Sequence, residues 1–344
     1  MRIKMAINTN KKRVLVIQPL HPAGMEMLKA RDDIEIIECD SLDENVIAEA
    51  AKDVHAMTVR GATITRKIMS QAPDLMVVSR HGVGYDAVDL NTLNERNIPL
   101  CIAIHSNMIS VAEQAMALLL ELAKDIFYYD GVTRTDDWGP RFPTRAIDLD
   151  GKNLLIIGFG RIGRQVAKRA LGFDLKVFGY DPYVDDTILK AANVEPVSDF
   201  RKVLRDMDAV TIHCMKTEET TNMFSEAEFK DMKPDAFIVN CARGGIINEH
   251  ALYQALISGE IKGAGLDVLL DEPSAADHPL FSLKNVLLSP HIAGVTVEST
   301  QRMATQTVDN VLRVFDGNID PECVVNQSVL SYIWIKFELT GEEL

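Results

Sequence analysis

Gly158-Phe159-Gly160-Arg161-Ile162-Gly163 is the most informative motif of this 344-residue chain. It follows an apolar run, Leu154–Ile157, that is typical of a buried strand, and Arg164–Leu171 after it has the pattern of a helix. A second apolar run, Leu175–Gly179, comes next and ends just before Asp181. A strand, a glycine turn, a helix and a strand in this order predict a βαβ unit of a parallel sheet.

The glycine string has the spacing of a dinucleotide-binding turn. Such glycines permit a tight turn and a close approach of the backbone to a pyrophosphate, which lies at the helix N-terminus. Asp181 is 18 positions past Gly163, where an acid bonds the ribose hydroxyls. Because a carboxylate there repels a 2′-phosphate, and Pro182-Tyr183 offers no cation for one, the sequence favours NAD over NADP. The alternative is a glycine turn that only packs a helix on a strand. The predicted contacts are Gly158, Gly160, Arg161, Ile162, Gly163 and Asp181.

Composition and charge argue against several classes of protein. With 47% hydrophobic and 25% charged residues the chain is typical of a globular protein, and its length favours two domains. Its apolar runs fall far short of the roughly 18 residues of a membrane span, and Met1 to Leu20 lacks the apolar core of a secretory signal. A net charge of −14 argues against nucleic-acid and membrane partners. Five scattered cysteines predict a cytoplasmic protein without a disulfide frame or a metal site.

Two series of alternating strands and helices follow one another along the chain. Between them, Ser110-Val111-Ala112-Glu113 predicts a capping box at the start of a helix that runs to about Tyr129, and Thr133–Asp148 is predicted as a loop. The expected strands are Val14–Ile17, Ile34–Ile37, Ala56–Val59, Leu75–Val78 and Leu100–Ala103, then Asn153–Ile157, Leu175–Gly179, Ala209–His213, Ala236–Val239, Gly263–Val268 and Val286–Ser289. The expected helices include Glu44–Ala51, Ile64–Gln71, one capped by Ser225 and Glu228, one after Asn248, and Val297–Asp316 before Gly317.

Three polar residues follow strands of the second series. Arg243, Glu272 and His291 come after its fourth, fifth and sixth strands. Because ligands gather outside the carboxyl ends of the strands in an open parallel sheet, all three are expected on the edge where the glycine string places a cofactor. A guanidinium binds a carboxylate, a histidine exchanges a proton near neutral pH, and a neighbouring carboxylate stabilises the charged imidazole. Each residue alone has an ordinary structural explanation, but together they predict hydride transfer with a 2-oxo acid.

The glycine string with Asp181, Asn240–Gly245, Asp267–Pro273 and Pro290–Gly294 resembles the D-isomer-specific 2-hydroxyacid dehydrogenase family, which includes phosphoglycerate dehydrogenase, hydroxypyruvate and glyoxylate reductases and D-lactate dehydrogenase. The resemblance implies an α/β fold with two doubly wound parallel sheets. A Rossmann NAD-binding domain, residues 109–296, would be inserted into a flavodoxin-like substrate-binding domain made of residues 1–108 and 297–344. It also implies a homodimer formed through the inserted domain, for which the helix at 111–129 is a candidate interface or, equally, a core helix.

The resemblance also implies roles for individual positions. His291 resembles the family's acid/base, paired with Glu272, and Arg243 resembles its substrate-orienting cation. Arg60 matches a loop near the substrate, and the amides of Val83 and Gly84 would hold the substrate carboxylate. Asp267 matches the acid that bonds the nicotinamide carboxamide, and a proline is usual where Met215 stands. The implied cofactor contacts outside the glycine string and Asp181 are His213, Thr220, Cys241, Ala242 and Asp267.

Family members with different substrates can be told apart in part. Glu272 argues against formate dehydrogenases, which carry Gln there, and Val83 argues against phosphite dehydrogenase, which carries Lys. The loop Arg80–Asp89 is closer to the phosphoglycerate and hydroxypyruvate group than to D-lactate enzymes. We expect hydroxypyruvate or glyoxylate as the substrate. A short-form 3-phosphoglycerate dehydrogenase is the alternative, since no long regulatory segment follows Asn326, and an NAD(H)-sensing corepressor-like binding protein is the alternative of another class. Candidate cations for a phosphate group are Arg60, Arg80, Arg134, Arg141 and Arg145.

Overall fold

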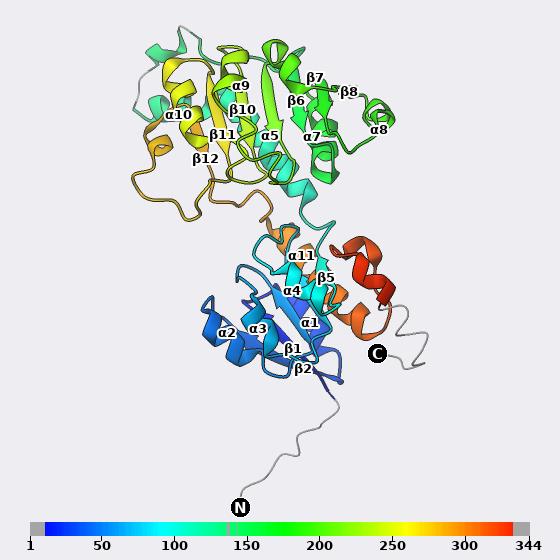
Figure 1. Cartoon of the computed structure of the whole chain (residues 1–344). Coiled ribbons are helices and arrows are strands. Elements are labelled where there is room, and N and C mark those ends of the chain that lie inside the picture. The colour runs from blue at the N-terminus through cyan, green and yellow to red at the C-terminus, as the bar shows by residue number, and fades with distance from the viewer. Residues whose placement is uncertain (1–10, 136–137, 143, 333–344) are drawn as a thin grey trace, which may run out of the picture. The chain divides into compact units, whose positions relative to one another are not determined.

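The computed structural model describes residues 11–135, 138–142 and 144–332 (Figure 1). The described residues form two compact units, one containing residues 11–107 and 297–332 and the other lying within Met108–Thr296. The expected boundaries at 108/109 and 296/297 fall within one residue of this division. Two terminal segments lie outside the described residues. Residues 333–344 are most of the segment 331–344, to which the sequence assigns no role. Residues 1–10 are half of the segment 1–20, which is expected to lack a secretory signal. Within the described residues, no helix combines the length and the hydropathy needed to cross a membrane.

The first unit is built on a five-stranded parallel sheet. Its strands lie in the order β2-β1-β3-β4-β5, so the chain starts near the middle, moves to one edge and then crosses to the other. This is the strand order of flavodoxin-like doubly wound folds. The strands are β1 (Lys12–Ile17), β2 (Ile34–Cys39), β3 (Ala56–Val59), β4 (Val77–Arg80) and β5 (Leu100–Ile102).

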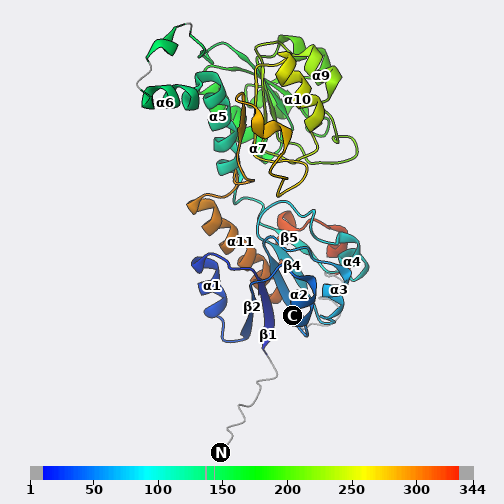
Figure 2. The same cartoon turned by 90° about the vertical axis from the view of Figure 1, so that its left-hand side faces the viewer.

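Alternate residues of these strands point to opposite faces and supply two hydrophobic layers. Val14 and Val16 pack with residues of α1 and α11, whereas Leu15 and Ile17 pack with residues of α2, α3 and α4 on the other face (Figure 2). The last helix, α11, therefore returns to the first sheet and ends ahead of Gly317, whose φ is 69°. The helices are α1 (Pro22–Lys29), α2 (Glu44–Ala50), α3 (Arg66–Ser70), α4 (Leu90–Glu95) and α11 (Val297–Phe315).

The second unit is built on a seven-stranded parallel sheet. Its strand order, β12-β11-β10-β9-β6-β7-β8, is that of a Rossmann fold, with the first strand of the unit in the interior and a reversal of direction between β6 and β9. Both parallel sheets confirm the predicted α/β fold class. The strands are β6 (Asn153–Ile157), β7 (Lys176–Tyr180), β8 (Glu195–Pro196), β9 (Ala209–Ile212), β10 (Phe237–Asn240), β11 (Gly263–Leu266) and β12 (Val286–Leu288).

Helices cover both faces of this second sheet. Leu154 and Ile156 pack in a layer with α5 and α7, and Leu155 and Ile157 pack in the opposite layer with α9 and α10. The α-helices are α5 (Met108–Lys124), α6 (Ile126–Arg134), α7 (Arg161–Leu171), α8 (Asp186–Ala191), α9 (Glu226–Asp231) and α10 (Glu249–Ser258). Short 3₁₀ helices lie at Gly139–Arg141, Phe200–Lys202, Leu204–Asp206, Pro279–Ser282 and, in the first unit, Pro321–Cys323.

The predicted capping box at Ser110 and Glu113 is wrong. α5 begins at Met108, so Ser110 lies inside the helix and not ahead of it. The Ser110 hydroxyl is instead 3.2 Å from the hydroxyl of Thr296, and Glu113 forms an ion pair with Arg169 at 2.8 Å. Both side chains serve contacts with other segments of the second unit.

The predicted helix to Tyr129 is also interrupted. Asp125 has φ 54°, in the left-handed region, which ends α5 and starts α6, and α6 extends into the segment predicted as a loop. In contrast, two other cap predictions are confirmed. Ser225 and Glu228 form the capping box of α9, and the side chain of Asn248 caps α10.

Candidate active site

The predicted cofactor and catalytic residues of the second unit lie at the carboxyl ends of six neighbouring strands. The strand order reverses between β6 and β9, which is the switch point where open α/β sheets bind ligands. The loops after β6, β7, β9, β10, β11 and β12 begin, in that order, at Gly158, Asp181, His213, Cys241, Asp267 and Ser289.

Three glycines shape the turn after β6 for different reasons. Gly158 has φ 92°, and a Cβ there would lie 2.6 Å from the amide nitrogen of Cys214. A Cβ on Gly163 would lie 2.1 Å from the carbonyl oxygen of Gly158, so this glycine lets α7 pack closely on the turn. A Cβ on Gly160 would have no atom within 4 Å, apart from those of the glycine itself and of the two neighbouring residues in the chain. No described part of the chain fills that space, which leaves room for a ligand.

The N-terminus of α7 points to the kind of ligand. α7 begins at Arg161, three residues earlier than predicted, so Arg161 and Ile162 belong to its first turn. Its N-cap residue, Gly160, supplies no side-chain hydrogen bond to the first-turn amides. Unpaired amides and the positive end of the helix dipole bind phosphate groups. The pyrophosphate of a dinucleotide therefore fits this end of the helix.

Asp181 connects the loop after β7 to the glycine turn. Its Oδ2 accepts a hydrogen bond from the N–H of Phe159 at 2.8 Å, and its Oδ1 accepts one from the N–H of Tyr183 at 3.0 Å. These two bonds fix the carboxylate next to the turn. The ribose hydroxyls of a dinucleotide fit that position.

The loop after β9 carries two of the predicted cofactor contacts. His213 Nε2 lies 2.8 Å from the hydroxyl of Thr211, and its buried Nδ1 has no hydrogen-bond partner among the described residues. Burial lowers the pKa of His213 to about 3, so the ring is neutral near pH 7. Thr220 instead closes its own loop, because its hydroxyl donates to the carbonyl of Met215 at 2.7 Å and accepts from the N–H of Thr217 at 2.7 Å.

Asn240, which the sequence analysis did not select, organises the loop that presents Arg243. Its buried side chain donates from Nδ2 to the carbonyl oxygen of Arg243 at 2.9 Å and accepts at Oδ1 from the N–H of Ala242 at 3.0 Å. The Arg243 guanidinium donates to the carbonyl oxygen of Ala242 at 2.7 Å. Cys241 lies between Asn240 and Ala242 in the chain and is buried. Burial raises the pKa of its thiol and keeps the thiol protonated. The sequence feature that could have identified Asn240 is a side-chain amide at the last position of a strand, β10.

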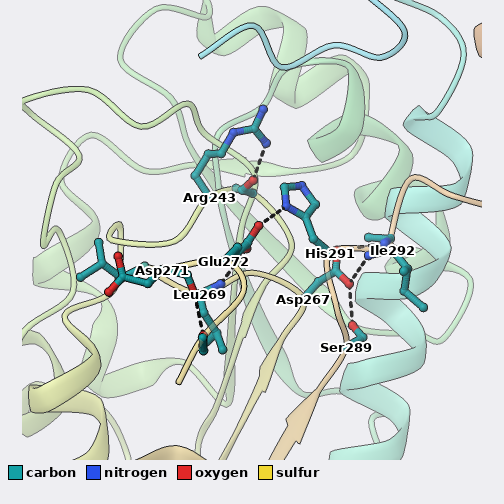
Figure 3. A network of polar contacts seen from close by, with 12 residues as sticks. Arg243, Asp267, Leu269, Asp271, Glu272, Ser289, His291 and Ile292 are labelled. Atoms are coloured by element: carbon teal, nitrogen blue, oxygen red, sulfur yellow. Dashed lines mark hydrogen bonds and ion pairs between the residues drawn. The ribbon is translucent and has the colours of Figure 1, made fainter. Parts of the chain in front are cut away.

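The Arg243 loop packs against the loop that carries Glu272. A Cβ on Gly244 would lie 1.8 Å from the carbonyl oxygen of Leu269, so only glycine allows this approach. The N–H of Leu269 donates to Glu272 Oε1 at 2.9 Å, and Glu272 Oε2 lies 2.6 Å from His291 Nδ1 (Figure 3). The structure thus brings the three predicted catalytic residues onto adjoining loops, with both oxygens of the glutamate bound.

Asp267 holds the turn that carries His291. Its Oδ1 accepts from the Ser289 hydroxyl at 2.5 Å and from the N–H of Ile292 at 2.9 Å, and its Oδ2 accepts from the N–H of Ala293 at 2.9 Å (Figure 3). Its carbonyl oxygen accepts from the N–H of His291 at 2.8 Å. Because a carboxylate has about four acceptor positions, one is left for another donor. Asp267 therefore positions His291, a role that its place after a strand does not reveal.

The predicted substrate residues of the first unit lie after β3 and β4. Arg60 is exposed at the end of β3, and Val83 and Gly84 lie in the loop beyond β4. The amides of Val83 and Gly84 donate no hydrogen bond to any described residue, which leaves them able to bind an anion. The Arg80 guanidinium donates to the carbonyl oxygen of His81 at 2.6 Å. In the part of the chain that the structure describes, no group of His, Cys, Asp and Glu side chains is arranged to hold a metal ion.

Comparison with known proteins gives consistent matches. Residues 116–293 match the NAD binding domain of D-isomer specific 2-hydroxyacid dehydrogenases. The chain is 36% identical to D-3-phosphoglycerate dehydrogenase of Methanocaldococcus jannaschii, and the match covers 91% of this chain and 59% of that protein. It is 33% identical to glyoxylate reductase of Korarchaeum cryptofilum, and this match covers 93% of this chain and 97% of that protein. The solved structure of an NADPH-dependent glyoxylate/hydroxypyruvate reductase from Sinorhizobium meliloti gives a TM-score of 0.82 at 25% identity, covering 92% of this chain and 99% of that one. The chain thus spans about three fifths of the phosphoglycerate dehydrogenases that it matches.

Proposed function

The chain belongs to the D-isomer specific 2-hydroxyacid dehydrogenase family, and from that membership we propose an NAD-dependent enzyme that transfers a hydride reversibly between NADH and a small polar 2-oxo acid. Hydroxypyruvate and glyoxylate are the substrates we favour. The observation that carries the proposal is the 2.6 Å contact between His291 Nδ1 and Glu272 Oε2, at the sheet edge that also holds the glycine turn. An imidazole paired with a carboxylate is suited to proton transfer near neutral pH.

In this mechanism His291 is the acid and the base. Because Nδ1 faces Glu272, the proton that reaches the substrate is carried by Nε2. The bound nicotinamide supplies the hydride in this chemistry. His291 donates its Nε2 proton to the carbonyl oxygen during reduction and takes a proton from the hydroxyl during oxidation. Glu272 stabilises the protonated imidazole, and the N–H of Leu269 keeps the glutamate in place.

We propose substrate-binding groups in each unit: Arg243 in the second unit and the amides of Val83 and Gly84 in the first. A planar guanidinium binds a carboxylate through two parallel hydrogen bonds, which also fixes its orientation. The two amides lack acceptors among the described residues and can bind an anion. Arg60, exposed at the end of β3, adds positive charge near this loop.

We propose NAD as the cofactor. The open space at Gly160 and the uncapped N-terminus of α7 support the pyrophosphate site, and the fixed Asp181 carboxylate supports a ribose with a free 2′-hydroxyl. The neutral His213, with its unpartnered Nδ1, supports a cofactor contact after β9. The remaining proposed contacts are Gly158, Arg161, Ile162, Gly163, Thr220, Cys241, Ala242 and Asp267.

A 3-phosphoglycerate dehydrogenase is the second candidate, and the 36% identity to the Methanocaldococcus enzyme favours it. The loop arginines give it little support. Arg134 and Arg145 form ion pairs with Asp130 and Asp125 at 2.7 and 2.5 Å, both within the second unit. Arg60 is therefore the better candidate for a phosphate ligand.

We further propose a cytoplasmic homodimer with its interface on α6 and the residues that follow. The apolar residues of α5 are buried in the core of their own unit, so the first part of the predicted 111–129 interface is a core helix. α6 has no buried residue, and Ile126, Phe127, Trp138 and Phe142 are exposed by 54%, 72%, 57% and 77%. These exposed apolar side chains, close together in the sequence, are the interface that we propose.

The test of the proposed activity is NADH oxidation by the purified full-length chain with a panel of 2-oxo acids. The panel contains hydroxypyruvate, glyoxylate, phosphohydroxypyruvate, pyruvate and 2-oxoglutarate, with NADPH as the comparison cofactor. Preference for hydroxypyruvate or glyoxylate supports the proposal, and preference for phosphohydroxypyruvate supports the second candidate. Tight NADH binding without turnover of any acid contradicts both and favours an NAD(H)-sensing binding protein.

A further inference from the structure

Tyr183 connects the loop after β7 to the loop after β9. Its N–H donates to Asp181 Oδ1 at 3.0 Å, and its Oη donates to Glu219 Oε2 at 2.8 Å. The tyrosine is 81% exposed. Hydrogen bonds between exposed groups contribute little to folding stability, so stability alone does not explain this connection.

The connection lies at the ribose end of the nucleotide site. Asp181 accepts from Tyr183 with one oxygen and from the N–H of Phe159, in the glycine turn, with the other. Glu219 is therefore separated from Asp181 by no more than one tyrosine side chain. Asp181 follows β7, where an acid bonds the adenosine ribose of a dinucleotide, and Tyr183 joins Glu219 to this position.

Carboxylates outnumber cations around this end, where Lys216 lies in the loop after β9 and Arg164 Nε donates to the carbonyl oxygen of Phe159 at 3.1 Å. The segments 181–186 and 217–221 contain five acidic residues, namely Asp181, Asp185, Asp186, Glu218 and Glu219, and neither Lys nor Arg. The hydrogen bond to Glu219 and its negative charge raise the pKa of Tyr183, so the phenol stays protonated and continues to donate. Tyr183 thus holds the Glu219 carboxylate at a fixed place in this loop.

We propose that Glu219, held by Tyr183, is a second carboxylate that excludes a 2′-phosphate and so determines, together with Asp181, the preference for NAD over NADP. This inference rests on the proposed function, because it assigns a specificity role at the same nucleotide site. A 2′-phosphate carries a charge close to −2. A unit charge at about the length of a tyrosine side chain from it changes its affinity by a factor of about five at low salt.

The experiment measures the dissociation constants of NADH and NADPH by nicotinamide fluorescence, without substrate, for the full-length wild type and three variants. Glu219→Gln removes the charge but keeps an acceptor for Tyr183, and Tyr183→Phe keeps the charge but removes the hydrogen bond. Glu218→Gln is the matched control, because it removes the same charge from the neighbouring position. Each protein is measured at about 0.01 M and about 1 M salt, where the screening lengths differ tenfold.

We expect the ratio of the NADPH to the NADH dissociation constant to fall about fivefold in Glu219→Gln at low salt and to change little at 1 M salt. Glu218→Gln should change the ratio by less than half as much, and Tyr183→Phe should lower it in the same direction as Glu219→Gln. An unchanged ratio in Glu219→Gln, or an equal change in Glu218→Gln, overturns the role of Glu219. An unchanged ratio in Tyr183→Phe overturns the role of the tyrosine. If the wild type binds no NADH, the proposed function itself fails.

Discussion

Asp267→Asn is the substitution that most sharply separates positioning of His291 from cofactor binding. The carboxylate of Asp267 accepts three hydrogen bonds from the turn, from the Ser289 hydroxyl and the N–H groups of Ile292 and Ala293. An asparagine amide can offer its oxygen to one side only. Its NH₂ group must then face a backbone N–H, which leaves a buried donor without an acceptor.

The expected cost follows from these contacts. Hydrogen bonds to a charged acceptor contribute about 1.5–3 kcal/mol each, and an unsatisfied buried donor costs about 1–3 kcal/mol. Asp267 is 1% exposed and Ala293 is 3% exposed, so water cannot replace the lost acceptor. We therefore expect the variant to lose about 3 kcal/mol of unfolding free energy. Because a small displacement of a catalytic group costs up to about a hundredfold in rate, kcat should fall about 10- to 100-fold.

Urea unfolding of the apo protein and steady-state kinetics at saturating NADH measure these two effects. Ser289→Ala is the graded control, since it removes one donor, leaves both backbone bonds and should cost about 1 kcal/mol. The reasoning is refuted if Asp267→Asn unfolds within 1 kcal/mol of the wild type and changes only the KM for NADH. That result would assign Asp267 to the nicotinamide contact alone.

Three further predictions concern the acid/base pair, acid stability and assembly. Glu272→Gln should lower kcat of the reduction about 100-fold or more, because a neutral amide neither orients the His291 ring nor stabilises its protonated form as a carboxylate does; an unchanged kcat would remove Glu272 from the mechanism. Burial lowers the pKa of His81 from 6.5 to about 4. Between these two pH values the unfolded chain binds a proton that the folded chain does not. The unfolding free energy should therefore fall by about 1.4 kcal/mol per pH unit as the pH is lowered through this range. Urea titrations should show a shallower fall in His81→Gln, and equal slopes would contradict this. Phe127→Asp should convert the proposed dimer to a monomer in sedimentation, whereas a dimer that persists would place the interface elsewhere.

Local pattern was sufficient for much of this fold. Leu154–Ile157 is a continuous apolar run, and as a strand it places successive residues in opposite hydrophobic layers. The glycine string predicts the turn after β6 because the steric demands of that turn fall on residues close together in the sequence. The prediction that Arg243, Glu272 and His291 share one edge of the sheet likewise needed only the ends of three strands.

The sequence could not reveal features that depend on contacts between distant segments. The helix break at Asp125 coincides with an ion pair between Asp125 and Arg145, 20 residues away. The helical periodicity of the sequence does not predict this ion pair. The three bonds that Asp267 makes to the turn of His291 join residues 22 to 26 positions apart. The capping-box prediction at Ser110 failed because that pattern does not fix the first residue of a helix, and α5 begins two positions earlier.

The role of His291 as proton donor is tested by comparing the wild type with His291→Ala at saturating NADH and 2-oxo acid. NADH binding, measured separately by fluorescence, shows that the variant keeps its nucleotide site. We expect kcat to fall by about 10²–10⁴, the usual contribution of a general acid, and NADH affinity to stay within a few fold of the wild type. A variant that retains wild-type kcat would contradict the assignment of His291 as the proton donor.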